Sequence, residues 1–330
     1  MTGRSIVSLG LSAGGAAVLL ALLLATSHLD LHALMDMVLA IRPTMLLALI
    51  ALLAINTLLS GEKWRLVDKR LRGQASALPR PLYFALTAFG TMLGSVIPMP
   101  LGAAVTRSLG LHFHGGRGLV RGGAATLFEQ GYDLLVAAVL TSATAALMIL
   151  GGGPIKWILL AGGASIIGLL CSGVAAGLVI RIFRRFGSRR AGVPGGRLAG
   201  LAASVVNSEL LGPTLVRRLF VLSLLRFFNL SLMAGATTAA FGLEVPLWQL
   251  SAALPLAMLA SALPLTPGGL GVIEWTFVSV LVAFGTRFDA AAEWAVLNRL
   301  AVTLAGIAIG IMGAMVGLWV RAPRTTSPSA

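Results

Sequence analysis

The chain has 330 residues, of which 57% are hydrophobic and only 11% are charged, whereas soluble domains carry roughly 25% charged residues. So few charges cannot cover a soluble surface, which excludes a soluble enzyme, a disulfide scaffold, a nucleic-acid-binding domain and a disordered chain. The net charge of +14 reflects bases that lie in short segments beside apolar runs, as the positive-inside rule predicts. We expect an all-α, multi-pass protein of the bacterial inner membrane.

The apolar runs and the basic segments between them predict an orientation. The first uncharged run, residues 5–27, is longer than a signal-peptide core of about 7–15 residues and is interpreted as a retained transmembrane helix. The arginine- and lysine-rich segments 61–81 and 181–197 should be cytoplasmic. The stretch 28–42 should be outside, and both termini should be cytoplasmic.

The stretch 82–110 lies between segments that both read as cytoplasmic, so it cannot cross the membrane once. Its middle contains Pro98, Pro100 and Gly102. Two prolines so close together break a helix, because each removes a hydrogen-bond donor and clashes with a preceding carbonyl. We predict a re-entrant hairpin of two half-helices, whose broken backbone must be covered by protein or by a polar cavity.

The stretch 247–286 should begin and end outside, so it presents the same problem from the opposite face. Its break contains two prolines and three glycines: Pro264, Pro267, Gly268, Gly269 and Gly271. A second re-entrant hairpin and two short full helices satisfy the topology equally well, and we favour the hairpin.

The predicted fold class is a polytopic helix bundle of about six full spans plus two hairpins, or of eight or more spans. Residues 1–152 and 153–320 each read as helix, helix, hairpin and helix, with opposite orientations. Such an inverted repeat is typical of secondary transporters. The tail 321–330 is rich in Ser, Thr and Pro and should be disordered, and 197–215 is interpreted as an interfacial connector helix.

Ionisable residues within membrane spans are costly and are functional candidates by default. We expect substrate-binding roles for six of them: Arg107, Arg226, Arg299, Glu129, Asp133 and Glu274. Guanidinium groups suit phosphate, and the free amides of the glycine-rich breaks can also bind an anion. This predicts an amphipathic anion as the substrate, with carboxylates that hold the arginines or carry a coupling proton.

Alternative roles remain for the carboxylates and for Arg226. Glu129 and Asp133 share one helix face and could simply favour the first turns of a helix that starts near Gly123. Glu274 should lie about two turns into its half-helix, and Arg226 roughly 13 Å into its own helix. These last two could form a structural ion pair with each other.

Two of the arginines could instead extend toward the lipid headgroups. Arg107 would do so on the cytoplasmic side and Arg299 on the outer side, in the first turns of the last helix. Seven residues separate Pro100 from Arg107, as seven separate Pro267 from Glu274, so we expect equivalent places for Arg107 and Glu274 in the two hairpins.

These motifs resemble the transmembrane domain of lysylphosphatidylglycerol synthases and the wider flippase-like family that has this domain alone. The signature Pro-x-x-Pro-Gly-Gly-x-Gly-x-x-Glu runs from Pro264 to Glu274. A second set matches the family pattern: Pro100, Gly102, Arg107, Glu129, Asp133 and Arg299. Ala103 and Gln130 replace an Asp and an Arg that the family usually has, and the resemblance covers about residues 40–320.

The resemblance implies movement of phospholipids, polyprenyl-linked lipids or hopanoid-related lipids. We expect the soluble aminoacyltransferase domain to be absent, and therefore no synthesis of lysylphosphatidylglycerol by this chain.

An integral-membrane lipid enzyme and an accessory subunit of lipid or cell-envelope biosynthesis are the alternative functions. Two histidine-containing groups could bind a metal, but neither has a signature spacing. They are the pair His112 and His114 and the set His28, Asp30, His32 and Asp36. We expect no catalytic residue, no metal, no cofactor and no nucleic-acid partner. We expect a membrane lipid as the substrate, and either a homo-oligomer or a complex with a lipid-biosynthesis partner.

Overall fold

The computed structural model describes residues 41–72, 78–95, 97, 99–115, 119–189, 212–263 and 266–320, together with short runs and single positions between 17 and 39. Within these residues every regular element is a helix, and five helices are long and apolar enough to cross a membrane. The predicted all-α bundle is therefore confirmed. Several predictions fall wholly or partly outside the described residues: most of the helix 5–27, residues 197–211, the tail 321–330, Pro98, Pro264, His28 and Asp30.

The elements divide into long and short helices. The long ones are α3 (Pro43–Arg72), α6 (Leu119–Leu150), α7 (Pro154–Arg189), α9 (Pro213–Phe241) and α12 (Phe288–Trp319). The short ones are α4 (Arg80–Leu93), α5 (Met99–Gly115), α10 (Leu247–Ala262), the 3₁₀ turn η2 (Pro267–Gly269) and α11 (Val272–Ala283). A helix of about 20 residues is needed to span the hydrocarbon core, so each short helix reaches only part of the way.

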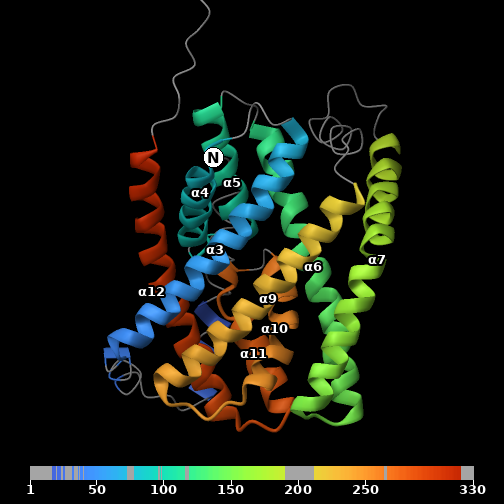
Figure 1. The fold of residues 1–330 in the computed structure, drawn as a ribbon. Helices are drawn as coiled ribbons and strands as arrows, with labels where there is room; N and C mark the ends of the chain where they lie inside the picture. The colour runs from blue at the N-terminus through green and yellow to red at the C-terminus, as the bar shows by residue number, and fades with distance from the viewer. Residues whose placement is uncertain are drawn as a thin grey trace, which may run out of the picture.

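The short helices form two pairs that enter the bundle from opposite ends. Figure 1 shows α4 and α5 in its upper half and α10 and α11 in its lower half. The α4–α5 pair starts and finishes at the end of the bundle where α3 finishes, and the α10–α11 pair starts and finishes at the other end. This arrangement has the geometry that the two predicted hairpins require, and their re-entry from opposite membrane faces stays a prediction.

The breaks of the two pairs touch each other inside the bundle. Gly268 of η2 has φ +59°, and a Cβ built there would lie 2.7 Å from the carbonyl oxygen of Ser95, in the turn between α4 and α5. The prediction that Pro100 and Gly102 lie within the first break is wrong, because α5 already begins at Met99. Proline is tolerated in the first turn of a helix, where the missing donor has no partner in any case.

Packing across the two halves links equivalent elements. The first pair packs through α4 on α12, the last helix of the second half, and the second pair packs through α10 on α6, the last long helix of the first half. The helices α3 and α9 pack on each other as well. This reciprocal pattern is what an inverted repeat would give, and the division into 1–152 and 153–320 stays a prediction.

Two long helices extend further than the uncharged runs suggested. The helix α3 continues to Arg72, so the basic residues expected in the loop 61–81 lie largely on its last turns. The helix α6 begins at Leu119 rather than near Gly123. The uncharged runs underestimate the length of these helices, because some of the charged residues are paired in the interior and do not mark a helix end.

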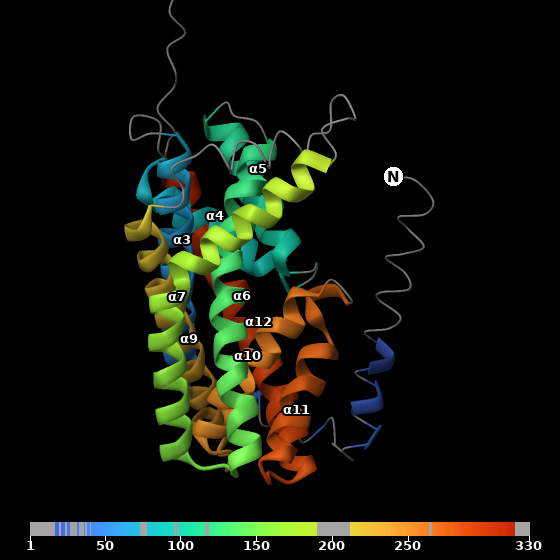
Figure 2. The ribbon, with the colours of Figure 1, turned by 90° about the vertical axis from the view of Figure 1, so that its right-hand side faces the viewer.

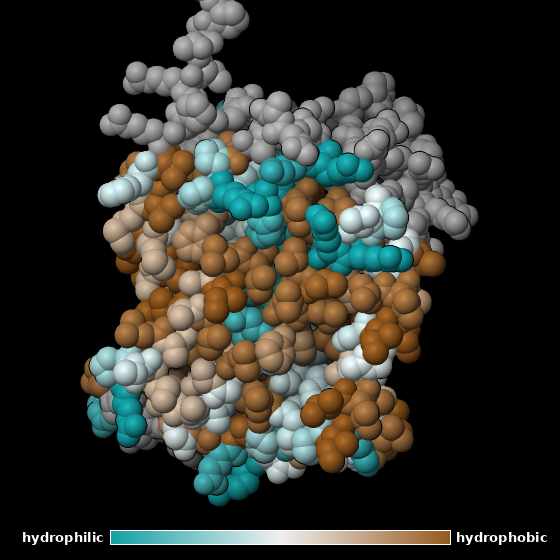
Figure 3. All heavy atoms as spheres, in the orientation of Figure 1, coloured by the Kyte–Doolittle hydropathy of each residue, from teal (hydrophilic) through white to brown (hydrophobic). Residues whose placement is uncertain are grey.

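The surface of the bundle is largely apolar. Figure 3 shows hydrophobic residues over the middle of one face and hydrophilic residues gathered toward its upper and lower edges. The helix α7, at the edge of the bundle in Figure 2, exposes Ile158, Leu170 and Val174 at 68–76% of their full areas. A soluble protein rarely exposes such a surface, so the fold is that of a multi-pass membrane protein.

Candidate functional site

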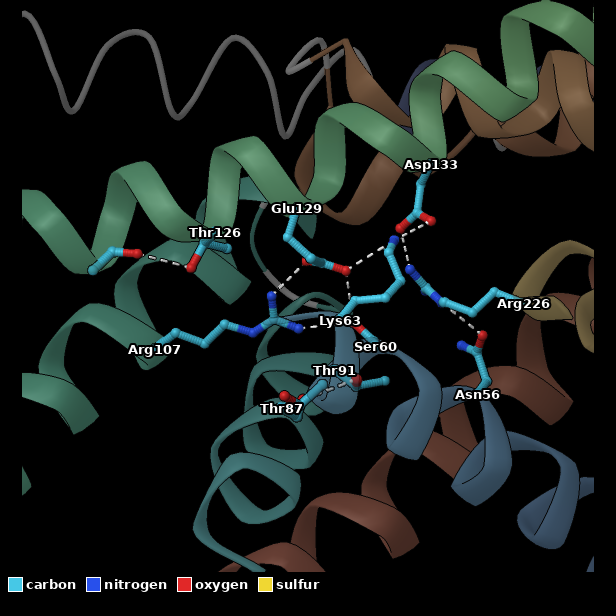
Figure 4. A network of polar contacts seen from close by, with 11 residues as sticks. Asn56, Ser60, Lys63, Thr87, Thr91, Arg107, Thr126, Glu129, Asp133 and Arg226 are labelled. Atoms are coloured by element: carbon cyan, nitrogen blue, oxygen red, sulfur yellow. Dashed lines mark hydrogen bonds and ion pairs between the residues drawn. The ribbon is translucent and has the colours of Figure 1, made fainter. Parts of the chain in front are cut away.

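A chain of ion pairs lies between α3, α5, α6 and α9 (Figure 4). At one end Arg107 Nη1 donates to Glu129 Oε2 at 2.7 Å. Lys63 Nζ lies 3.1 Å from Glu129 Oε1 and also pairs with Asp133 Oδ1. At the other end Arg226 Nη1 donates to Asp133 Oδ2. Each carboxylate therefore bridges two cations, and we call these five side chains the central network.

Neutral residues of α3 complete the central network. Ser60 Oγ accepts a hydrogen bond from Arg107 Nη2 at 2.8 Å, and Asn56 Oδ1 accepts one from Arg226 Nε at 3.0 Å. The guanidinium carbon of Arg107 lies 5.1 Å from the centre of the Trp64 ring, within the range of a cation–π contact. The helix α3 thus contacts both ends of the network.

Helical spacing explains why these residues converge. Asn56, Ser60 and Lys63 follow one another at intervals of four and three residues, and Glu129 and Asp133 are four apart. Residues three and four apart lie on one helix face, so α3 and α6 each present a row of polar side chains on one face. The contact between α3 and α6 brings the two faces together.

The burial of the central network is graded. The side chains of Lys63 and Glu129 are completely buried and Arg107 is 2% exposed, whereas Asp133 is 10% and Arg226 17% exposed. Ionised groups are stable in such an interior only when they are paired and hydrogen-bonded. Arg226 and Asp133 are therefore the most exposed members of the network.

The central network has more positive than negative charge. It contains three cations and two carboxylates, which gives a surplus of one positive charge (3 − 2 = +1). Two buried N–H donors beside it, Arg107 Nε and Trp64 Nε1, have no hydrogen-bond acceptor among the residues that the structure describes. Buried donors are normally paired, so the charge and the donors of this site would suit an anion with oxygen acceptors.

A second polar cluster lies at the break between α10 and α11. Arg299 of α12 donates from Nη2 to the carbonyl oxygen of Gly268 at 2.8 Å, and its Nε lies 3.5 Å from Glu274 Oε1. The other oxygen, Glu274 Oε2, accepts the backbone N–H of Gly271 at 2.7 Å. Gly271 precedes the first residue of α11, so Glu274 caps that helix. We call Glu274, Arg299 and the backbone of Gly268 and Gly271 the break cluster.

Positive φ angles explain the glycines of this break. Gly268, Gly269 and Gly271 have φ of +59°, +70° and +81°, a region that residues with a side chain rarely adopt. Pro267 begins η2. The predicted break is therefore confirmed at its glycines, although its first proline lies outside the described residues.

The six predicted site residues are divided between two places. Arg107, Glu129, Asp133 and Arg226 belong to the central network, and Glu274 and Arg299 belong to the break cluster. The alternative that Glu274 and Arg226 pair with each other is wrong, because each has a different partner.

Other expectations about positions are also wrong. Glu274 is the third residue of α11 instead of lying two turns inside it, whereas Arg107 is the ninth residue of α5, so the two do not hold equivalent helix positions. Arg226 is the fourteenth residue of α9, which places it roughly 20 Å along the axis. Arg107 and Arg299 pair inside the protein instead of extending to headgroups.

Lys63 is the functional candidate that the sequence did not reveal. The surrounding bases suggested a cytoplasmic loop, yet Lys63 is completely buried and joins both carboxylates. The regular spacing of Asn56, Ser60 and Lys63 was the available indication, since it predicts a polar stripe on a continuing helix. Among the residues that the structure describes, no group of three His, Cys, Asp or Glu is placed to hold a metal ion.

A bundle of long apolar helices with paired charges in its interior defines the class as a multi-pass membrane protein. The chain matches the family model described as lysylphosphatidylglycerol synthase TM region over residues 5–310. It therefore belongs to this family, a membrane-protein family of lipid or cell-envelope biosynthesis or transport. No curated protein matches the chain.

Proposed function

We propose that this protein moves an anionic, phosphate-bearing lipid across the bacterial inner membrane without changing it chemically. The lipid would be a phospholipid, a polyprenyl-linked lipid or a hopanoid-related lipid. The membership of the lysylphosphatidylglycerol synthase TM family supports a role with lipids. Both termini would be cytoplasmic, since the basic segments are concentrated at the end of the bundle where α3 finishes.

The unbalanced charge of the central network is the observation that supports this function most directly. Three cations facing two carboxylates would be neutralised by one further anion, and the unpaired Arg107 Nε and Trp64 Nε1 donors would find acceptors in its oxygens. A phosphate group provides both, and arginine binds it with particularly good geometry. A purely structural network would be expected to balance its own charges.

The place of the network favours transport over a role on the membrane surface. It is formed by three spanning helices and one short helix, and Arg226, its most exposed arginine, lies near the middle of α9. A charged group at the centre of a membrane helix costs about 2.5–3.5 kcal/mol or more, so charges at that depth are functional candidates by default. A lipid headgroup that crosses the bilayer needs polar partners at this depth.

The experiment that tests the proposal is a leaflet-accessibility assay in proteoliposomes. Purified protein would be reconstituted with a fluorescent phosphatidylglycerol or a fluorescent polyprenyl phosphate, and a membrane-impermeant quencher would report which leaflet holds the probe. We expect protein-dependent movement of at least one probe. Arg226→Ala should abolish it, because the outermost cation of the network is lost.

Arg217→Ala is the matched control for that variant. Arg217 also belongs to α9, but it is exposed and lies near the start of the helix, so the variant should retain the wild-type rate. Equal rates in Arg226→Ala and wild type would contradict a role for the central network. A lack of movement of every anionic lipid by folded wild-type protein would contradict lipid transport itself.

A further inference from the structure

We propose that Glu274 is the proton-binding carboxyl of this protein, and that a proton bound there releases Arg299 for the phosphate group of the transported lipid. This inference rests on the proposed transport function and names the ion that would be coupled to it. It concerns the break cluster, which the charge argument for the central network does not use.

The carboxylates of the central network are poor places for a proton. Glu129 contacts Arg107 through one oxygen and Lys63 through the other, and Asp133 contacts Lys63 and Arg226 in the same way. Neutralising either acid would raise the surplus of buried positive charge from one to two. Uncompensated buried charge is strongly unfavourable, so these acids should stay ionised.

Glu274 differs from both of them. It is 2% exposed, and its Oε1 is a buried oxygen that receives no hydrogen bond from any residue in the described part of the chain. The Arg299 Nε that faces Oε1 lies 3.5 Å away, too far for a good hydrogen bond. A proton can therefore be placed on Oε1 while Oε2 continues to accept the N–H of Gly271 and to cap α11.

The surroundings of Glu274 contain little other charge. Arg299 is its charged partner from α12, whose two acids, Asp289 and Glu293, lie nearer the start of that helix. The helix α10, which packs on α11, has no ionisable residue, and α11 has Glu274 alone. Trp275 Nε1 donates to the carbonyl of Leu19, so an uncharged stretch of the N-terminal segment contacts α11 as well. A single proton on Glu274 therefore changes the net charge of the break cluster from zero to one positive charge.

Arg299 would keep one anchor after Glu274 is neutralised. Its Nη2 still donates to the carbonyl of Gly268, which holds the guanidinium at the break. The side chain is 19% exposed, and its positive charge would no longer be balanced. Arg299 could then bind a phosphate, and loss of the proton would restore the Glu274 pair and release the lipid.

A labelling experiment tests the proton site without measuring transport. Dicyclohexylcarbodiimide modifies protonated carboxyl groups in apolar surroundings, and mass spectrometry of the full-length protein in proteoliposomes identifies the modified residue. We expect labelling of Glu274 that declines as the pH is raised, and no labelling of Glu129 or Asp133. Labelling of Glu274 that is absent or independent of pH, or labelling of Glu129 or Asp133 in its place, would overturn the proposal.

A second measurement tests the coupling. Lipid movement in proteoliposomes would be compared with and without an imposed pH gradient, and the ratio of the two rates recorded. We expect a ratio different from one for wild type and equal to one for Glu274→Gln, whatever residual rate that variant has. Asp289→Asn, which removes an exposed acid of α12, should retain the wild-type ratio. An unchanged ratio in Glu274→Gln would overturn the proposal.

The two measurements separate this proposal from the proposed function. If wild-type protein moves lipid but the rate ignores the pH gradient, transport stands and proton coupling fails. If no lipid moves, the proposed function fails, while the labelling pattern still decides whether Glu274 binds a proton.

Discussion

Arg107 and Glu129 lie 22 residues apart in the sequence and form a 2.7 Å ion pair in which both side chains are almost fully buried. The pair joins α5, the second helix of a broken pair, to the spanning helix α6. Because Glu129 also contacts Lys63 of α3, this one carboxylate connects three helices. The stability of the bundle should therefore depend strongly on it.

Substitution of the two partners should have unequal effects. Glu129→Gln leaves three buried cations facing one carboxylate and should lower the free energy of unfolding by about 3–5 kcal/mol. Arg107→Met removes one cation and leaves two cations facing two carboxylates, so it should lower the free energy of unfolding by only about 1–3 kcal/mol. Thermal unfolding of the purified protein in detergent measures both. A larger loss of stability in Arg107→Met than in Glu129→Gln would contradict the charge surplus.

Lys63 should matter far more than its neighbours in the basic stretch of α3. Lys63→Met removes the cation that joins Glu129 to Asp133. Each carboxylate keeps one arginine, so the variant should lower stability by about 1–3 kcal/mol, the cost of the lost buried hydrogen bonds. Lys69→Met, a control on the same helix, alters a half-buried residue and should change stability by less than about 0.5 kcal/mol. The melting temperatures of the two variants in one detergent give the comparison. Equal values would contradict a stabilising role for Lys63 in the central network.

The contact between the two breaks can be tested through glycine. Gly268→Ala places a Cβ 2.7 Å from the Ser95 carbonyl at a φ of +59°. Gly242 has a similar φ of +66° but no atom within 4 Å of a built Cβ. Gly242→Ala therefore measures backbone strain alone, about 1–2 kcal/mol, and Gly268→Ala should cost about 1–3 kcal/mol more from overpacking. Similar losses in thermal unfolding would mean that the breaks do not touch.

The sidedness of the short helix pairs predicts a labelling pattern. In a background with Cys171, the sole cysteine of the chain, replaced by serine, we would place a cysteine at Phe113 or at Arg287. These positions are 75% and 85% exposed and lie near the finish of α5 and before the start of α12. A membrane-impermeant maleimide should label Phe113→Cys from the cytoplasm and Arg287→Cys from outside. Labelling of both from one side would contradict the two opposed hairpins.

The sequence by itself determined the membrane class and the pattern of helices. Long uncharged runs have no stable alternative to a helix in a bilayer, because every backbone donor must be satisfied within the segment. The glycines of the second break were equally readable, since Gly268, Gly269 and Gly271 occupy backbone conformations that other residues avoid. Such information is local, so a single sequence carries it.

Only the tertiary structure decided which charges meet. Arg107, Glu129, Asp133 and Arg226 were each recognisable as intramembrane charges, but their partners lie 22 to 93 residues away, and spacing along one chain does not indicate which helices pack together. Lys63 was hidden for the opposite reason. From the sequence alone, a basic residue is predicted to lie outside the membrane. A buried position becomes favourable only when a carboxylate lies opposite it, and here another helix supplies that carboxylate.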